Sequence, residues 1–243
     1  MPDTEFTITC PYCGEDVAIY LEPDTRGVFV QDCEVCCNPW QLRVTVDGDD
    51  RWVDVSRADD VKEMADAAFA HFGALDILVN NAGIGHLPQP LEGLPEDDFD
   101  RIVAVNMKAI YLAAKEIVPR MKAASRGVIL NMASTAGVSP RPRLTWYNAS
   151  KGWVITATRS MAVELAPFGI RVVALNPVAG ETPLLATFMG EDTPAMRAKF
   201  LATIPIGRFS TPEDLGNAAC FLCSDEAAMI TGVAMEVDGG RCI

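Results

Sequence analysis

The hydrophobic and polar positions divide the chain into two parts with different periodicities. In roughly the first 50 residues, apolar runs at 17–21, 27–30 and 41–46 contain alternating polar positions and are separated by turn-forming residues. No segment there has the 3.6-residue spacing of an amphipathic helix. This pattern predicts a small, β-rich, antiparallel module at the N-terminus.

From residue 57 onward, helix-like and strand-like patterns alternate. Helical spacing at 57–73 has an acidic first turn and stops at Gly73. Further helical patterns and buried-type strand patterns then follow one another. The helical ones lie at 95–124, 147–169 and 210–227, and the strands at 75–80, 127–134, 170–177 and 232–238. Alternating strands and helices imply crossover connections, a parallel sheet and a ligand site outside the carboxyl ends of its strands.

Composition and charge restrict the function classes. With 243 residues, 49% of them hydrophobic, the chain can bury a sizeable core. Its net charge of −13 argues against nucleic acid as a partner, because phosphate contacts need clustered Lys and Arg. Its first residues have no signal-peptide pattern, and no apolar run approaches the roughly 18–20 residues of a membrane span. We therefore expect a cytoplasmic protein without a membrane partner.

Five of the eight cysteines lie within residues 10–37. Cys10 and Cys13 form one CxxC pair, Cys33 and Cys36 form another, and 19 residues separate the pairs. Two such pairs make a four-thiolate tetrahedral site suited to zinc, whereas the alternative is free cysteines in a loop. Cys37 is adjacent to Cys36, so the identity of the fourth ligand stays open. We predict a zinc-ribbon-like module.

The segment at about residues 6–56 resembles the small bacterial CPXCG-motif cysteine-rich proteins. The resemblance rests on "ITCPYCGE" and "VQDCEVCCNPW". It names a module but implies no activity. Following it, we place the module at residues 1–53 and a second domain at residues 54–243.

The stretch "TWYNASK" contains a candidate catalytic pair. Tyr147 and Lys151 are one helical turn apart and so share a face. A phenol has a pKa near 10, and a nearby ammonium lowers it toward the range useful for acid–base catalysis. This spacing also recurs by chance, so a surface tyrosine beside a solvated lysine is the alternative. Ser134, at the end of a predicted strand, is placed to hydrogen-bond a substrate oxygen.

Several other motifs occur in order on the expected elements. They are "NNAG" at 80–83, "VN" at 105–106, "NMAS" at 131–134, "YNASK" at 147–151, "NP" at 176–177 and "DGG" at 238–240. As a set, they resemble the short-chain dehydrogenase/reductase family over about residues 54–243. The resemblance implies NAD(P)-dependent hydride transfer between a nicotinamide and a small alcohol or ketone.

The resemblance also implies a role for each site residue. Tyr147 would be the general acid/base, Lys151 would lower its pKa and hold the nicotinamide ribose, Ser134 would orient the substrate carbonyl, and Asn106 would hold the water of a proton relay. The remaining cofactor-binding residues would be Asp54, Asn80, Ala82, Gly83, Pro177 and Thr182. Residues 183–205 would form a lid over the substrate. The family also implies a homodimer or homotetramer.

The sequence lacks the part of such an enzyme that binds the pyrophosphate. A strand, a glycine-rich turn and a helix should open the dinucleotide fold. Before Gly73 the only glycines are Gly14, Gly27 and Gly48, each isolated. We therefore predict an α/β fold with an incomplete Rossmann-like parallel sheet flanked by helices. Its strand "DILVN" (76–80) should then be an exposed apolar edge. The missing part also leaves the choice between NAD and NADP open.

This gap leaves three interpretations. In the first, the chain is an oxidoreductase that binds its cofactor weakly or by a modified route. Alternatively, it is a catalytically impaired fusion or remnant that acts only as a zinc-binding interaction protein. In the third, recombination or an assembly artefact joined two families near "VSRADD" (55–60).

Overall fold

The computed structural model describes residues 5–23, 25–35, 39–47, 50–57, 61–182 and 184–243. The chain forms two compact units, Met1–His71 and Phe72–Ile243. Each unit has its own hydrophobic core and is described separately. None of the described helices is both long and apolar enough to cross a membrane.

The N-terminal unit is built from antiparallel strands, as the alternating pattern predicts. β1 (Glu5–Thr9) pairs with β2 (Asp16–Tyr20). β3 (Gly27–Asp32), β4 (Pro39–Asp47) and β5 (Asp50–Arg57) form a three-stranded sheet in that order. Their buried side chains gather around the fully buried Trp40 and Leu42. β5 spans the domain boundary that we predicted after residue 53, and α1 (Val61–Phe72) follows it.

The C-terminal unit contains a four-stranded parallel sheet in the order β6-β7-β8-β9. Its strands are β6 (Ile77–Asn80), β7 (Gly127–Met132), β8 (Ile170–Pro177) and β9 (Ala234–Val237). β8 is buried along nearly its whole length because helices cover both of its faces. This confirms the predicted α/β class and the incomplete Rossmann-like sheet.

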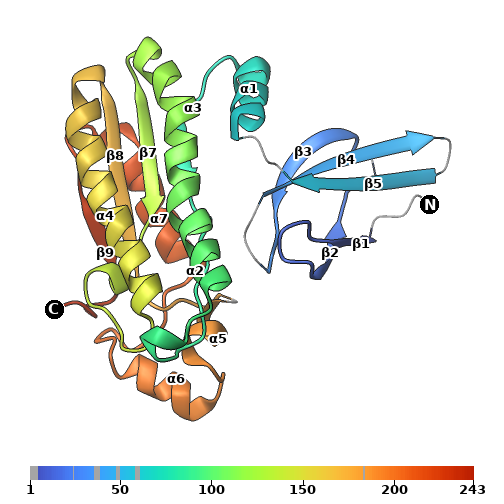
Figure 1. Cartoon of the computed structure of the whole chain (residues 1–243). Coiled ribbons are helices and arrows are strands. Elements are labelled where there is room, and N and C mark those ends of the chain that lie inside the picture. Colours follow the sequence, from blue (N-terminus) through green and yellow to red (C-terminus); the bar gives the residue numbers. More distant parts are fainter. Residues whose placement is uncertain (1–4, 24, 36–38, 48–49, 58–60, 183) are drawn as a thin grey trace. The chain divides into compact units, whose positions relative to one another are not determined.

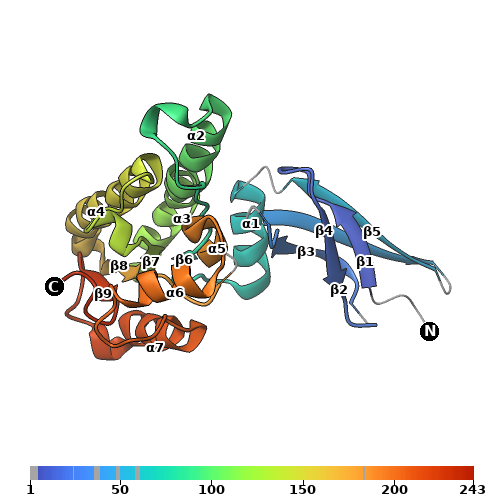
Figure 2. The ribbon, with the colours of Figure 1, turned by 90° about the horizontal axis from the view of Figure 1, so that it is seen from below.

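Helices pack on the two faces of this sheet. Figures 1 and 2 show α3 (Ala109–Ala124) and α4 (Thr145–Leu165) on one face and α7 (Pro212–Cys223) on the other. Val154 of α4 packs against Ala174 of β8 on the first face, and Leu222 of α7 packs with strand residues on the second. α2 (Glu96–Val103) precedes α3, and a five-residue π-helical segment, Ala104–Lys108, joins the two.

β6 is the edge of the sheet, as the sequence predicted. Among the described strands it pairs only with β7. Ile77 and Val79 point to the same face of the strand and are 44% and 50% exposed, whereas Leu78 on the opposite face is buried. Their register partners in β7, Val128 and Leu130, pack against α7. The apolar face of β6 beside α7 is therefore uncovered within the described unit.

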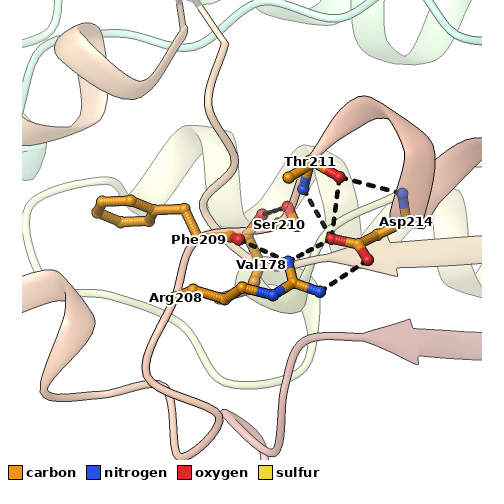
Figure 3. A network of polar contacts seen from close by, with 6 residues as sticks. All are labelled: Val178, Arg208, Phe209, Ser210, Thr211 and Asp214. Atoms are coloured by element: carbon orange, nitrogen blue, oxygen red, sulfur yellow. Dashed lines mark hydrogen bonds and ion pairs between the residues drawn. The ribbon is translucent and has the colours of Figure 1, made fainter.

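Two short helices, α5 (Leu184–Met189) and α6 (Pro194–Leu201), lie beyond the carboxyl ends of the strands (Figure 1). They occupy the segment predicted to be a lid. A polar network anchors the chain that leaves them (Figure 3). Thr211 caps α7 through a capping box with Asp214, and Arg208 pairs with the same Asp214. Ser210 donates a hydrogen bond to the carbonyl of Val178, which ties this segment to the end of β8.

Candidate active site

Tyr147 and Lys151 lie in the first two turns of α4 and face the interior of the C-terminal unit. Tyr147 is 6% exposed and Lys151 is 5% exposed, so the alternative of a surface tyrosine with a solvated lysine is wrong. The Lys151 ammonium donates a hydrogen bond of 2.8 Å to the backbone carbonyl of Met132, the last residue of β7. α4 and the end of β7 together hold this cation beside the phenol.

Ser134 sits on the turn that follows β7. Its backbone is extended, and its hydroxyl accepts a hydrogen bond from the Ala136 amide to cap the short helix Thr135–Gly137. The Ser134 side chain also hydrogen-bonds Tyr147. The turn approaches α4 so closely that a Cβ on Gly137 would lie 2.8 Å from the backbone of Lys151 and Gly152. A glycine at this position therefore lets Ser134 reach the tyrosine.

Asn106 lies in the π-helical segment between α2 and α3 and is 1% exposed. Its side-chain oxygen accepts the Ile84 amide at 2.9 Å. Its side-chain nitrogen donates to the Ile84 carbonyl at 3.0 Å and to the Ser150 hydroxyl at 2.9 Å. Asn106 thus joins the loop after β6 to α4. The sequence did not predict the π-helical segment, a local form that often marks functional sites.

The residues predicted to bind the cofactor fall into three groups. Gly83, Pro177 and Thr182 line a cavity together with Tyr147 and Lys151. Asn80 and Ala82 are not among its lining residues: Asn80 donates a hydrogen bond of 2.7 Å to the side chain of Asn131 on β7, and Ala82 packs beside Ile84. Asp54 lies in β5 of the N-terminal unit, opposite Arg43 in the antiparallel register, and its side chain is outside the description.

The cavity has a volume of about 470 Å³, which is in the range of small-ligand sites. It is lined from the carboxyl ends of β7 and β8 and from α5 and α6. Its lining includes Ser134, Arg141, Leu144, Leu185, Phe188 and Phe200. The Phe188 ring lies 4.8 Å from the Tyr147 ring, measured between centroids. The tyrosine therefore meets the cavity beside an aromatic wall.

The acid–base balance of Tyr147 differs from the simple expectation. Burial raises the pKa of Tyr147 to about 12, although the hydrogen bond with Ser134 and the charge of Arg141 both act to lower it. The Lys151 ammonium lies 5.9 Å from the centre of the tyrosine ring. Arg141 is a further cation that acts electrostatically on the phenol.

Sequence reasoning missed Arg141, which lies six residues before Tyr147 in "PRPRLTWY". Its guanidinium stacks over the Phe200 ring at 4.0 Å. Burial, together with the charge of Arg241, lowers the pKa of Arg141 to about 10. No motif pointed to this arginine, because only the folding of the loop before α4 brings it to the cavity.

In the N-terminal unit, three cysteines form a compact cluster. The sulfur atoms of Cys10, Cys13 and Cys33 all lie within 4.8 Å of one another. Cys36 and Cys37 lie outside the described residues, so the choice between them as fourth ligand remains a prediction. Three converging thiols on two hairpin-like turns fit the tetrahedral thiolate shell of zinc.

Hydrogen bonds to Cys10 prepare its sulfur to bind a cation. The amides of Tyr12 and Cys13 point at this sulfur at 3.3 and 3.5 Å, and the Trp40 indole donates to it at 3.1 Å. Burial raises the pKa of the Cys10 thiol, but these hydrogen bonds outweigh it and lower the pKa to about 6. Such donors favour the thiolate, which is the form that binds zinc.

Comparisons with known proteins identify the family of each unit. A family profile described as Enoyl-(Acyl carrier protein) reductase matches residues 43–241, and one described as Bacterial zinc ribbon domain matches residues 8–57. The chain belongs to the short-chain dehydrogenase/reductase family and carries an N-terminal zinc ribbon domain. Both resemblances stated from the sequence are confirmed.

Two characterised relatives are similar to the chain. The 4-formylbenzenesulfonate dehydrogenase of Comamonas testosteroni is 49% identical over 191 residues, which are 78% of this chain and 76% of that protein. The cis-4-hydroxycyclohexanecarboxylate dehydrogenase of Sinomonas cyclohexanicum is 38% identical over 191 residues, or 78% of this chain and 75% of that protein.

Solved structures of dehydrogenases and reductases are also similar to the chain. The 3-ketoacyl-(acyl-carrier-protein) reductase of Brucella melitensis, complexed with NADH, is 55% identical with a TM-score of 0.71 and covers 75% of this chain and 74% of that one. The gluconate 5-dehydrogenase of Burkholderia cenocepacia, in complex with NADP and tartrate, is 33% identical with a TM-score of 0.71. This match covers 74% of this chain and 70% of the gluconate 5-dehydrogenase chain.

Proposed function

We propose that the chain is an NAD(P)-dependent oxidoreductase that interconverts an alcohol and a carbonyl compound, with Tyr147 as the acid/base. The observation that carries this proposal is the buried Tyr147, hydrogen-bonded to Ser134 and beside Lys151, on the wall of a cavity. Asn106 would hold the proton-relay water from its position next to Ser150.

The proton chemistry of the reduction follows from this arrangement. A nicotinamide held beside Tyr147 would supply the hydride that reduces the carbonyl carbon. The Tyr147 hydroxyl gives its proton to the carbonyl oxygen, which the Ser134 hydroxyl holds in place, so that the product is an alcohol. The high pKa keeps Tyr147 protonated at neutral pH, which is the form that reduction needs. The charge of Arg141 and the hydrogen bond with Ser134 stabilise the phenolate left behind.

The residues around the cavity fit the nicotinamide end of the cofactor. A Cβ on Gly83 would lie 3.1 Å from the Lys151 ammonium, so the absence of a side chain keeps this edge of the cavity open. Lys151 and Thr182 would hold the ribose and amide groups, and Pro177 would contact the ring. The relatives solved with NADH and NADP support a nicotinamide cofactor. For the pyrophosphate the sequence offers no glycine-rich turn, and NAD or NADP remains an open choice.

The substrate would be a small alcohol, aldehyde or ketone. Lid helices with Phe188 and Phe200 give the cavity aromatic walls that suit a ring-bearing molecule. Two relatives are named 4-formylbenzenesulfonate dehydrogenase and cis-4-hydroxycyclohexanecarboxylate dehydrogenase, and these names support this choice.

The exposed Tyr111 on α3 and Val163 on α4 support the homodimer or homotetramer that the family implies. A cytoplasmic location remains a prediction.

Isothermal titration of the full chain with NADH and NADPH tests the cofactor proposal. We expect saturable heat with at least one nucleotide. A chain that is folded by circular dichroism and gives no heat with either would refute it.

A second candidate function is favoured by the uncovered edge at β6, where Ile77 and Val79 are exposed. In this alternative the dehydrogenase unit is catalytically impaired, and the chain acts only as a zinc-binding interaction protein through Cys10, Cys13, Cys33 and Cys36. Native mass spectrometry tests the premise of this alternative, which is that the chain binds zinc. One bound zinc ion per chain is expected, and a zinc-free protein at neutral pH would count against it.

A further inference from the structure

The cavity beside Tyr147 is cationic although the chain is acidic. Among its described lining residues, two carry a charge, Arg141 and Lys151, and none is acidic. The chain as a whole has a net charge of −13. The charged residues that line this cavity are all positive, although the protein as a whole is negative. Such a cavity favours an anionic ligand.

The position of Arg141 is fixed by the helical turn that carries the tyrosine. The side chain of Asn148, the residue after Tyr147, donates a hydrogen bond of 2.7 Å to the backbone carbonyl of Arg141. The Arg141 guanidinium rests on the Phe200 ring at 4.0 Å. Stacking occupies a face of the guanidinium plane and leaves its in-plane N–H groups to hydrogen-bond a planar anion.

Arg141 has no counter-ion within the part of the chain that the structure describes. Other arginines of this unit are paired: Arg197 with Asp192 and Glu181, and Arg208 with Asp214. The cation that acts on Arg141 is Arg241, which donates a hydrogen bond of 3.1 Å from Nη1 to the Ser139 hydroxyl. The buried Nε of Arg241 has no hydrogen-bond partner among the described residues. Neither arginine forms an ion pair within the described residues, and two like charges held close together are costly unless a bound anion compensates them.

We propose that Arg141 binds an anionic group, such as a carboxylate, on the substrate and is a specificity-determining residue of this enzyme. This proposal rests on the proposed function, since it places the reacting carbonyl at Tyr147 and Ser134. The apolar body of the substrate lies between them, against Phe188, Leu144 and Leu185. The substrate class is therefore an aldehyde, ketone or alcohol on a small ring that also carries an acidic group.

The first arm of the test compares turnover of two aldehydes that have nearly the same shape. 4-Formylbenzoate carries the anion and 4-formylbenzamide does not. We expect the wild-type chain to favour the benzoate in kcat/KM by roughly 10- to 100-fold. Arg141→Gln should abolish this preference, mainly through a higher KM for the benzoate. Because Arg141 also stabilises the Tyr147 phenolate, kcat should fall to a similar extent for both aldehydes. Arg141→Lys, which keeps the charge without the planar N–H edge, should restore part of the preference.

Arg126→Gln is the matched control. Arg126 pairs with Asp76 at the amino end of β7, at the opposite end of the strand from the site, and its substitution should leave the preference unchanged. Equal turnover of the two aldehydes by wild type, or an equal loss of kcat/KM for both in Arg141→Gln, would overturn the anion proposal and leave the oxidoreductase proposal standing.

The second arm measures binding and does not depend on turnover. 4-Formylbenzoate is titrated calorimetrically into the full-length Tyr147→Phe chain and into the same chain with Arg141→Gln added. Binding at least about 10-fold tighter with Arg141 present supports the proposal even if the wild type has no activity. Equal binding to the two chains, or none to either while both are folded by circular dichroism, contradicts it.

Discussion

The Lys151 ammonium donates its hydrogen bond to the Met132 carbonyl and lies 5.9 Å from the centre of the Tyr147 ring. This hydrogen bond joins α4 to the end of β7. Burial raises the pKa of the phenol, and Ser134 and Arg141 act to lower it. The proton donor is therefore held in its neutral form.

The raised pKa of Tyr147 predicts a pH dependence of stability. Because the folded state keeps this phenol protonated up to about pH 12, whereas an unfolded tyrosine ionises near 10, the tyrosine contributes stability below pH 10 that is lost as pH rises through 12. As the pH rises to 12, the free energy of unfolding of the wild type should fall by on the order of 2 kcal/mol more than that of Tyr147→Phe. Urea unfolding at pH 9 to 12 measures it, with the exposed Tyr111→Phe as control. Parallel curves for wild type and Tyr147→Phe would show that the phenol is not held neutral.

Close packing at Gly137 predicts a steric cost. In Gly137→Ala the new Cβ would meet the backbone of Lys151 and Gly152 at 2.8 Å, so the turn must shift and carry Ser134 away from Tyr147. We expect thermal stability to fall and turnover to drop at least about 10-fold. Gly216→Ala in α7, where a Cβ meets nothing within 4 Å, should be neutral or stabilising by about 1 kcal/mol. Unaltered melting temperature and kcat in Gly137→Ala would refute this packing.

The thiol cluster predicts a metal-dependent N-terminal unit. Cys13→Ser should lose the zinc ion, because Cys13 is one of three converging sulfurs, and the unit's strands should unfold on its loss. Elemental analysis gives the zinc content, and far-ultraviolet circular dichroism reports the strands. Cys220→Ser, at an exposed position on α7, is the matched control and should retain one zinc ion per chain. Equal zinc in the two variants would exclude Cys13 as a ligand.

The uncovered edge at β6 predicts self-association. A charge at Val79, which is 50% exposed beside the unpaired edge, should hinder strand-to-strand contact between chains. Val79→Lys should therefore reduce concentration-dependent light scattering relative to wild type. Met229→Lys places the same charge at a fully exposed position away from the strands, so it controls for net charge. If both substitutions reduce scattering equally, the edge is not the cause.

Much of the fold could be predicted because the periodicity of the sequence matches its secondary structure. The apolar runs at 127–134 and 170–177 contain β7 and β8, and the helical pattern at 147–169 contains most of α4. The exposed edge at β6 also followed from what the sequence lacks. The strand β5 was missed, because the predicted domain boundary was placed inside it.

The candidate site could be predicted only where motifs carry it. Tyr147, Lys151 and Ser134 come together as their motifs imply, since each ends or begins a regular element. Arg141 has no motif, and its place at the cavity depends on stacking with Phe200 and on the hydrogen bond from Asn148. The pKa of Tyr147 likewise depends on burial, which a local pattern of residues does not encode.

The central claim is that this chain transfers hydride with Tyr147 as the acid, and nucleotide absorbance at 340 nm tests it most directly. Full-length, zinc-loaded protein is mixed with NADH or NADPH and 4-formylbenzoate, alongside Tyr147→Phe. We predict that absorbance falls as alcohol forms with the wild type, and that the variant, folded to the same extent by circular dichroism, is inactive. Equal turnover by the variant, or no turnover by folded wild type with either nucleotide, would contradict the claim.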